Sequence, residues 1–356
     1  MILVTGGAGF IGSNFILEWL EREQSPVINL DKLTYAGNPE NLASLNGHQR
    51  YVFIHGDIND RPLIAQLLRQ HKPQAIVHFA AESHVDRSIH SPDDFIRTNV
   101  LGTHNLLEAT RAYLRDATVA ERIRFRFLHV STDEVYGSLG SDSTASTEAA
   151  PYAPSSPYAA SKAAADHLVR ACHLTYQFPA IITNCSNNYG PRQFPEKLIP
   201  LTTLNALSGK ALPVYGDGLN MRDWLFVTDH CDALRAVLHH GRIGATYNIG
   251  SNAEKTNLDV VRAICEVIDE IRPNPQIPDR SSLIQFVADR PGHDRRYALD
   301  TCKIRNELGW QPREQFDSGI RKTVAWYLEH PDWVNNVISG EYKEWLNTNY
   351  QNRGAR

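Results

Sequence analysis

The sequence has few cysteines and no long apolar run, and each shortage excludes a class of protein. The five cysteines in 356 residues form no C-x-x-C pair, which argues against a disulfide framework and a structural zinc site and favours a reducing compartment. No apolar run approaches the ~18 residues that a membrane span requires. The sequence begins at Met1-Ile-Leu-Val-Thr5 without a charged leader segment, so the cytoplasm is the expected compartment.

Neither sign of charge is in large excess. A formal net charge of −4 gives no electrostatic reason to expect a nucleic-acid or membrane partner. Any anionic ligand must therefore be held by a local cluster of donors. Since a single core stops growing near ~250–300 residues, the chain has room for one large α/β domain and a smaller one.

Short apolar runs alternate with helical patterns through the first half of the chain. Continuous apolar strands separated by helices are typical of a parallel sheet that is covered on both faces. We therefore expect an α/β fold, a doubly wound parallel-sheet Rossmann domain. The expected strands are Ile2–Thr5, Val27–Asp31, Tyr51–His55, Ala75–Ala80, Phe127–Ser131 and Ala180–Asn184. The expected helices are Ser13–Glu23, Arg61–Gln70, Phe95–Leu114 and Tyr158–Tyr176.

The alternation ends after about Asn188, where a proline-rich stretch, Tyr189–Pro200, begins. This change predicts a dinucleotide-binding domain at 1–188 and a smaller mixed α/β domain, mainly for substrate, at 189–356. A segment at about 223–245 is expected to return to the first domain. Helices are expected again near Asp229–His239, Asn257–Ile271 and Asp317–Glu329.

A glycine-rich loop, Gly6-Gly-Ala-Gly9-Phe-Ile-Gly12, joins the first expected strand to the first helix. Its glycines let the backbone approach a pyrophosphate, and the helix beginning near Ile11 offers free N–H groups. Asp31 follows after about 20 residues, where a carboxylate accepts the ribose hydroxyls of adenosine. Because that carboxylate repels a 2′-phosphate, NAD is favoured over NADP, although Lys32 next to it weakens the preference.

Tyr158 and Lys162 are four residues apart in Tyr158-Ala-Ala-Ser-Lys162 and therefore share a helix face. A free tyrosine, with a pKa near ~10, is a poor base. A neighbouring ammonium stabilises the phenolate and lowers that pKa, and Lys162 can also reach a cofactor ribose. The pair predicts proton abstraction beside a bound dinucleotide.

Thr132, Asp133 and Glu134 follow the strand Phe127–Ser131. Ligands of open parallel sheets bind at the carboxyl ends of strands, so these side chains are expected in the site. Two carboxyl groups act as acid and base when their surroundings separate their pKa values. The alternative is that both merely cap the next turn.

At these residues the chain resembles the extended short-chain dehydrogenase/reductases and, within them, the dTDP-glucose 4,6-dehydratase family. The Thr-Asp-Glu motif at 132–134 is the most specific feature, because epimerases of this fold lack the pair and GDP-mannose dehydratases are similar to Thr-Ser-Glu there. The resemblance covers nearly the whole chain, and Arg192, Met221, Thr228 and Cys231 depart from it. It is carried by Gly6–Ser13, Asp31–Asn38, Ala80–Ser88, Ser131–Gly137, Tyr158–His167, Thr183–Pro191, Phe194–Pro200, Asn220–Trp224, Asp289–Tyr297 and Glu307–Trp310.

The resemblance implies a mechanism for these residues. Tyr158 takes the proton of the sugar 4-hydroxyl while a hydride leaves C4 for NAD, and Thr132 hydrogen-bonds that oxygen. Glu134 then removes the C5 proton, and Asp133 protonates the 6-hydroxyl, which leaves as water. The hydride returns to C6 and yields a 4-keto-6-deoxy sugar, so NAD is regenerated and is expected to stay tightly bound.

The expected contacts fall into a cofactor set and a substrate set. The cofactor set, for NAD, is Gly6, Gly9, Phe10, Ile11, Gly12, Asp31, Lys32, Thr34, Asp57, Ile58, Ala80, Ala81, Thr98, Tyr158, Lys162 and Asn188. From the residues alone, Asp57 is either a turn residue or an adenine contact, and Thr98 and Asn99 face either the nicotinamide ribose or solvent. The substrate set, which the resemblance implies for dTDP-glucose, is Ser83, Thr132, Asn187, Lys197, Leu198, Pro213, Tyr215, Arg222, Asn257, Arg290 and His293.

Alternatives to this interpretation stay open at this point. They are a dehydratase or epimerase acting on a UDP or GDP sugar, and a dinucleotide sensor without turnover. The family also implies a homodimer formed through Phe95–Leu114 and Tyr158–Tyr176. The apolar positions of these helices fit burial within one subunit equally well: Leu106, Leu107, Leu168 and Val169.

Overall fold

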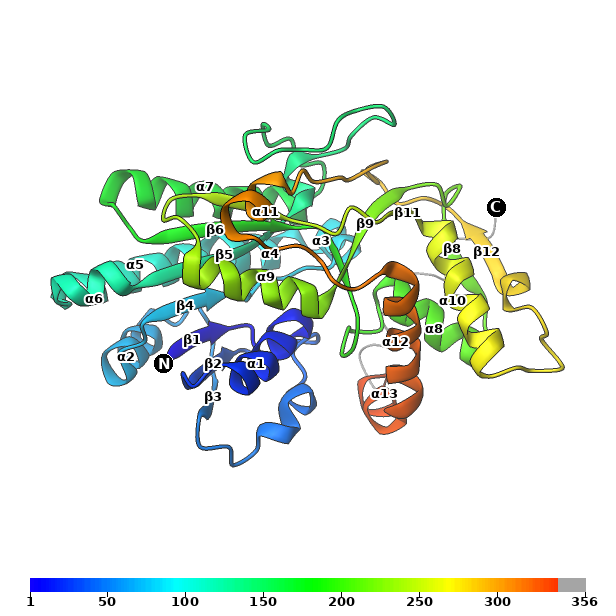
Figure 1. Ribbon diagram of the computed structural model, residues 1–356, viewed down its shortest axis with the longest axis horizontal. Helices are drawn as coiled ribbons and strands as arrows, with labels where there is room; N and C mark the ends of the chain where they lie inside the picture. Colours follow the sequence, from blue (N-terminus) through cyan, green and yellow to red (C-terminus); the bar gives the residue numbers. More distant parts are fainter. Residues whose placement is uncertain (339–356) are drawn as a thin grey trace.

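The computed structural model describes residues 1–338 and is centred on a seven-stranded sheet with the order β10-β6-β5-β4-β1-β2-β3 (Figure 1). All six strand pairings in it are parallel. The predicted fold class is confirmed. The strands are β1 (Ile2–Thr5), β2 (Val27–Asp31), β3 (Tyr51–His55), β4 (Ala75–His78), β5 (Arg126–Thr132), β6 (Ala180–Cys185) and β10 (Thr246–Ile249).

Helices cover both faces of this sheet because its central strands are apolar on both sides. Val4 belongs to the core that the sheet forms with α1 (Phe10–Arg22) and α9 (Val227–His240). Its neighbour Leu3 faces the opposite core, as alternate residues of a strand must. That second core lies under α2 (Arg61–His71), α5 (Thr103–Asp116) and α7 (Pro157–Tyr176).

The ends of several predicted elements were wrong. The first helix begins at Phe10, not Ser13, because Gly9 is already its N-cap. The strand predicted at Ala75–Ala80 ends at His78. The helix predicted at Phe95–Leu114 is split into α4 (Pro92–Phe95), a π-helical turn (Ile96–Gly102) and α5. Such turns are frequent at functional sites.

A second layer of elements lies at the right of Figure 1. Its core is formed mainly by Tyr189, Trp224 and the buried faces of three helices. The strands are β7 (Asn187–Tyr189), β8 (Leu212–Tyr215), β9 (Met221–Phe226), β11 (Glu254–Thr256) and β12 (Ile284–Val287), and the helices are α8 (Leu198–Leu207), α10 (Asn257–Ile271), α12 (Phe316–Glu329) and α13 (Pro331–Ile338). Short helices elsewhere are α3 (Val85–His90), α6 (Val119–Arg124) and α11 (Cys302–Leu308).

The chain crosses between the two layers more than once. After β9 it returns to the large sheet through α9 and β10, so the returning residues extend past 245 to Ile249. The helix α11 also contacts β10. Of the second predicted domain, 189–356, the residues 339–356 lie outside the described part.

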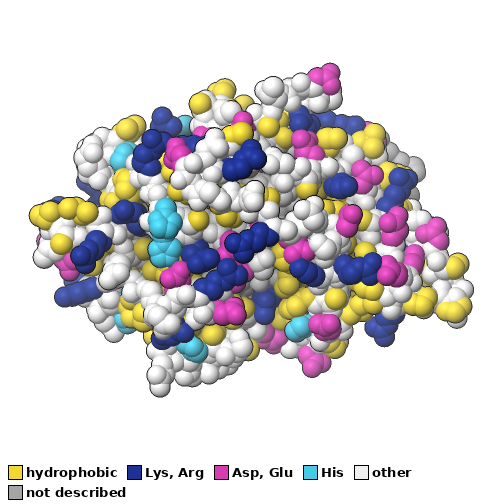
Figure 2. Space-filling view, viewed as in Figure 1, with side chains coloured by type: hydrophobic (Ala, Val, Ile, Leu, Met, Phe, Trp, Pro, Cys, Tyr) yellow, Lys and Arg dark blue, Asp and Glu magenta, His cyan; other side chains and the backbone are white. Residues whose placement is uncertain are grey.

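The surface and the helices agree with the composition. Figure 2 shows cationic and anionic side chains interspersed over the face in view, with no broad patch of one sign. None of the helices within residues 1–338 is both long and apolar enough to cross a membrane. All five cysteines are free, and four of them are buried.

Candidate active site

Two adjoining cavities lie where the strands of the large sheet end and the second layer begins. The first has a volume of about 300 Å³ and the second about 180 Å³. The wall between them is formed by the residues that line both: Ser83, Glu134, Asn187, Asn188, Gln193, Glu196 and Lys197. All members of the predicted cofactor set line the first cavity. All members of the predicted substrate set line the second except Thr132, which lines the first.

The glycine loop forms the floor of the first cavity. Gly6 has φ +73°, and a Cβ there would lie 2.5 Å from the backbone nitrogen of Ala80, so only glycine fits. Gly9 caps α1 without a side-chain hydrogen bond. Phe10 and Ile11, in the first turn of α1, line the cavity. The first-turn N–H groups and the positive end of the helix dipole suit a pyrophosphate.

Asp31 is fixed at the end of β2 by two backbone groups. Its Oδ2 accepts a hydrogen bond from the Ala8 nitrogen at 2.8 Å, and its Oδ1 accepts one from Leu33 at 2.8 Å. Burial raises the pKa of this carboxyl, and these hydrogen bonds oppose the rise. The Lys32 ammonium lies 2.8 Å from Asp57 Oδ2. Lys32 is thus paired with a carboxylate at the edge of the first cavity.

The π-helical turn places its two polar residues differently. Thr98 lines the first cavity. Asn99 is 1% exposed and faces neither cavity nor solvent. Its amide nitrogen donates to the Glu82 carbonyl at 3.0 Å and to Ser161 Oγ at 2.8 Å, and its oxygen accepts from the Glu82 nitrogen at 2.8 Å. Asn99 therefore joins the loop after β4 to α7.

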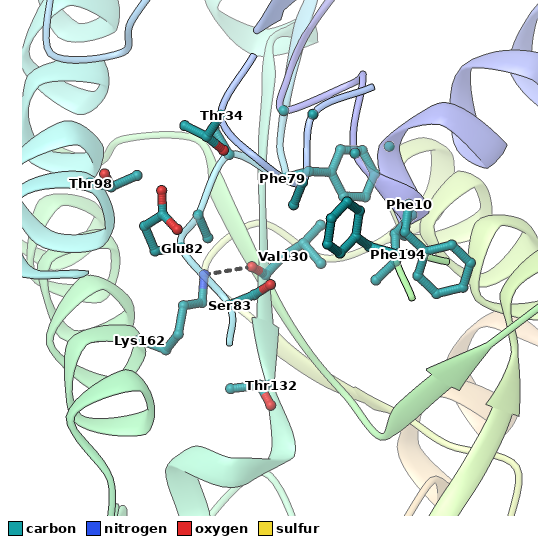
Figure 3. Close-up of a pocket in the computed structure, with 18 of the residues that line it drawn as sticks. Phe10, Thr34, Phe79, Glu82, Ser83, Thr98, Val130, Thr132, Lys162 and Phe194 are labelled. Atoms are coloured by element: carbon teal, nitrogen blue, oxygen red, sulfur yellow. Dashed lines mark hydrogen bonds between the residues drawn. The ribbon is translucent and has the colours of Figure 1, made fainter. Parts of the chain in front are cut away.

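Lys162 and Tyr158 are buried on one face of α7. The Lys162 ammonium donates to the Val130 carbonyl at 2.9 Å, as the dashed line in Figure 3 shows. Burial lowers the pKa of Lys162. The pKa of Tyr158 lies well above its usual range, first because of burial and next because of the charge on Glu134. A hydrogen bond with Thr132 opposes this rise. The lowering of the Tyr158 pKa that was predicted from Lys162 is not observed.

The Thr-Asp-Glu motif begins at the last residue of β5. Thr132 Oγ1 lies 3.3 Å from Asp133 Oδ1 and accepts a hydrogen bond from the Glu134 nitrogen, also at 3.3 Å. The pKa of Asp133 is raised well above its usual range by burial and then by the charge on Glu134. Its Oδ2 has no hydrogen-bond partner among the described residues. These surroundings favour the protonated form of Asp133, which is able to donate a proton.

Glu134 has different neighbours. Burial raises its pKa, but the charges of Arg290, Arg222 and Lys197 all lower it. It lines both cavities, whereas Asp133 lines only the first. The two adjacent carboxyl groups thus have separated environments, one next to a carboxylate and one facing three cations. This is the arrangement that an acid and a base require.

Three cationic side chains line the second cavity, together with three carboxyl groups. Arg222 is 4% exposed and donates to the Asp294 carbonyl at 2.8 Å. Lys197 Nζ donates to the Ser83 carbonyl at 2.8 Å. The buried Nε of Arg290 has no hydrogen-bond partner within residues 1–338. Arginine and lysine donors grouped in this way suit a diphosphate.

Several cavity residues were not predicted. All but Gln193 of those named here lie in segments that the resemblance to the family had already marked. Asp86, for example, accepts a hydrogen bond from the Tyr215 hydroxyl at 3.1 Å. The unpredicted residues include Glu82, His84, Asp86, Gln193, Glu196 and Tyr297.

Known proteins resemble this chain over almost its full length. Residues 3–323 match the family model described as GDP-mannose 4,6 dehydratase. A dTDP-glucose 4,6-dehydratase of Xanthomonas campestris is 58% identical, over 96% of this chain and 97% of that protein. The dTDP-glucose 4,6-dehydratase 1 of Escherichia coli is 56% identical, over 99% of each.

A solved structure agrees with these relatives. The dTDP-glucose 4,6-dehydratase of Streptomyces venezuelae, crystallised with NAD and TYD bound, has a TM-score of 0.86 and 47% identity. The match covers 94% of this chain and 99% of that one. The chain therefore belongs to the dTDP-glucose 4,6-dehydratase family of the extended short-chain dehydrogenase/reductases.

Proposed function

We propose that this chain is an NAD-dependent lyase that removes water from dTDP-glucose and forms dTDP-4-keto-6-deoxyglucose. The observation that carries the proposal is the pair of carboxyl groups at the end of β5. Asp133 and Glu134 are adjacent, yet their surroundings differ in charge. Hydride transfer alone, or epimerisation, has no need of such a pair.

The first cavity holds NAD in this proposal. Phe10 and Ile11 present backbone N–H groups to the pyrophosphate, and Asp31 accepts hydrogen bonds from the adenosine ribose. Lys162 and Thr98 line the same cavity, and in this proposal they contact the nicotinamide ribose. Bound NAD accepts a hydride from C4 of the hexose and later returns it to C6.

Tyr158 accepts the proton of the sugar 4-hydroxyl at its phenol oxygen. The hydrogen bond with Thr132 lowers the pKa of Tyr158 against the effect of burial. The resulting C4 ketone makes the proton on C5 acidic. Tyr158 therefore acts before the carboxyl pair.

Glu134 removes the C5 proton, and Asp133 gives its own proton to the 6-hydroxyl, which leaves as water. Glu134 acts as the base because three cations oppose the rise in its pKa that burial causes. Asp133 acts as the acid because burial and the Glu134 charge keep it protonated. In the second cavity, Lys197, Arg222 and Arg290 bind the diphosphate.

Mass spectrometry on a panel of nucleotide sugars tests this function. The purified protein with NAD is incubated separately with dTDP-, UDP- and GDP-hexoses, and the mass of each product is measured. We expect loss of one water from dTDP-glucose. Water loss from only a UDP or GDP sugar would reassign the substrate. An isobaric product would indicate epimerisation, and no product at all would indicate a sensor.

We also propose a cytoplasmic homodimer. The five free cysteines suit a reducing compartment. Leu106, Leu107 and Val169 are buried within the subunit, so they are not available to a partner. Apolar side chains that are exposed on the same predicted helices are available to a partner. Examples are Leu101, which is 53% exposed, and Leu174, which is 64% exposed. Sedimentation equilibrium of the wild type and of Leu174→Glu distinguishes a dimer through this face from a monomer.

A further inference from the structure

The wall between the two cavities contains a carboxylate where an anion is out of place. The Glu196 side chain is 2% exposed and lines both cavities. Each of these cavities suits a phosphate-bearing ligand, which a nearby carboxylate repels. A buried carboxylate persists only where other groups offset its charge. Glu196 is therefore better explained by its protein partners than by contact with a ligand.

Those partners come from two other segments of the chain. Arg87 Nε lies 3.2 Å from Glu196 Oε2, and His84 Nε2 lies 3.8 Å from the same oxygen. The Arg87 guanidinium in turn lies over the ring of Tyr35, 3.7 Å from its centroid. The Tyr35 ring also meets Phe194 edge to face at 5.6 Å. A closed set of contacts thus links the loop after β2, the start of α3 and the segment before α8.

Each of these three segments also forms part of the first cavity. Thr34 and Ala36 flank Tyr35, and both line it. The stretch from Phe79 to Ser83 leads into α3 and lines it as well, as does Phe194. Figure 3 shows Thr34, Phe79, Ser83 and Phe194 around one space although they come from three segments. The contacts of Glu196 therefore join three segments that line this cavity.

We propose that Glu196 is a positioning residue that holds these segments together, so that NAD stays bound from one turnover to the next. The inference rests on the function proposed above, in which NAD is regenerated and has no reason to leave. Opening the wall would separate Glu196 from Arg87, and breaking a buried charge pair is costly. Lys197, the next residue, donates a hydrogen bond to the Ser83 carbonyl in the same wall. The position of this substrate-site cation therefore depends on the same segments staying together.

The test is the rate at which NAD leaves the intact holoenzyme. Glu196→Gln keeps the size of the side chain but removes its charge. We expect NAD dissociation, followed after dilution into a trap for free NAD, to be about tenfold faster or more, because loss of one partner of a buried pair acts mainly on dissociation. The kcat, measured with NAD and substrate saturating, reports separately on the chemical steps, in which Glu196 moves no proton.

Two further variants keep the test valid if Glu196→Gln folds poorly. Arg87→Met removes the other partner, and combining it with Glu196→Gln should add little to the dissociation rate. Glu254→Gln is the matched control, because it breaks a carboxylate–arginine pair with Arg296 in which neither residue lines either cavity. It should lower the melting temperature without changing NAD release.

An unchanged rate of NAD release in folded Glu196→Gln and Arg87→Met would overturn the inference, even if both proteins melt earlier. This result is distinct from failure of the proposed function. That failure would appear as no loss of water from dTDP-glucose in the wild type, whose NAD release can be measured without any sugar.

Discussion

The cofactor cavity and the substrate cavity share a wall, but they use different kinds of group to bind an anion. In the first, the glycine loop offers backbone N–H groups at the start of α1, and Asp31 is held by backbone hydrogen bonds. In the second, Lys197, Arg222 and Arg290 supply full positive charges from three separate segments. Backbone donors neither titrate nor change with side-chain substitution, whereas the second cavity depends on individual side chains.

The reacting groups lie where the two cavities adjoin. Glu134 faces the three cations of the second cavity, and Asp133 and Tyr158 line only the first. The difference between the cavities is therefore also what separates the two carboxyl groups into base and acid. Substitutions that affect one cavity and leave the other unchanged test this comparison.

The largest effect is expected from Glu134→Gln. Loss of the base should lower the rate of water elimination by about 100- to 10,000-fold, while NAD affinity stays near that of the wild type. Uptake of solvent deuterium at C5, followed by mass spectrometry, measures the step directly. Unchanged turnover and exchange in this variant would contradict the role of Glu134.

Tyr158→Phe is the matched comparison, because it acts one step earlier. This variant should fail to reduce its bound cofactor when substrate is added, whereas Glu134→Gln should still do so. Absorbance of the reduced cofactor distinguishes them. Reduction at the native rate in Tyr158→Phe would remove its role as the base at the 4-hydroxyl.

A smaller effect, confined to the second cavity, is expected from Arg222→Met. A hydrogen bond to a charged group contributes about 1.5–3 kcal/mol, so KM for the nucleotide sugar should rise by about 10- to 100-fold. NAD affinity, measured by calorimetry, should hardly change. Arg222→Lys keeps the charge and should recover part of the loss.

Asp31→Asn should affect the first cavity and leave the second unchanged. One of its two carboxylate oxygens becomes an amide that cannot accept from a backbone N–H group, so NAD affinity should fall while KM for the sugar, at saturating NAD, stays constant. If each variant weakened both ligands equally, the two cavities would not be independent binding units.

The same difference explains how much was predictable from the sequence. The glycine loop and Asp31 are close in sequence and follow strands, so spacing alone located them. Lys197, Arg222 and Arg290 are brought together only by the fold, and resemblance to a family was needed to name them. Glu196 was missed because a buried carboxylate that holds loops together has no motif. The split of Phe95–Leu114 at a π-helical turn was missed because its residues fit a continuous helix.

The smallest effect concerns α1, the helix that follows the glycine loop, and it depends on pH. Glu18 lies on α1, its side chain is 16% exposed, and burial raises its pKa from 4.5 to about 7 despite Arg22 nearby. Because the folded-state pKa is above the unfolded value, the stability linked to this proton is fully present below pH 4.5. It is lost as pH rises through about 7.

Relative to Glu18→Gln, the unfolding free energy of the wild type should therefore decline by about 1–2 kcal/mol between pH 5 and pH 8. Glu270 of α10, in the second layer, is the contrasting control. Its hydrogen bond with Arg321 lowers its pKa, so its contribution is present above the unfolded pKa and lost only in acid. Glu270→Gln should leave the decline between pH 5 and pH 8 unchanged. Chemical denaturation at several pH values measures both, and a parallel change in the two variants would show that the decline does not originate under the cofactor cavity.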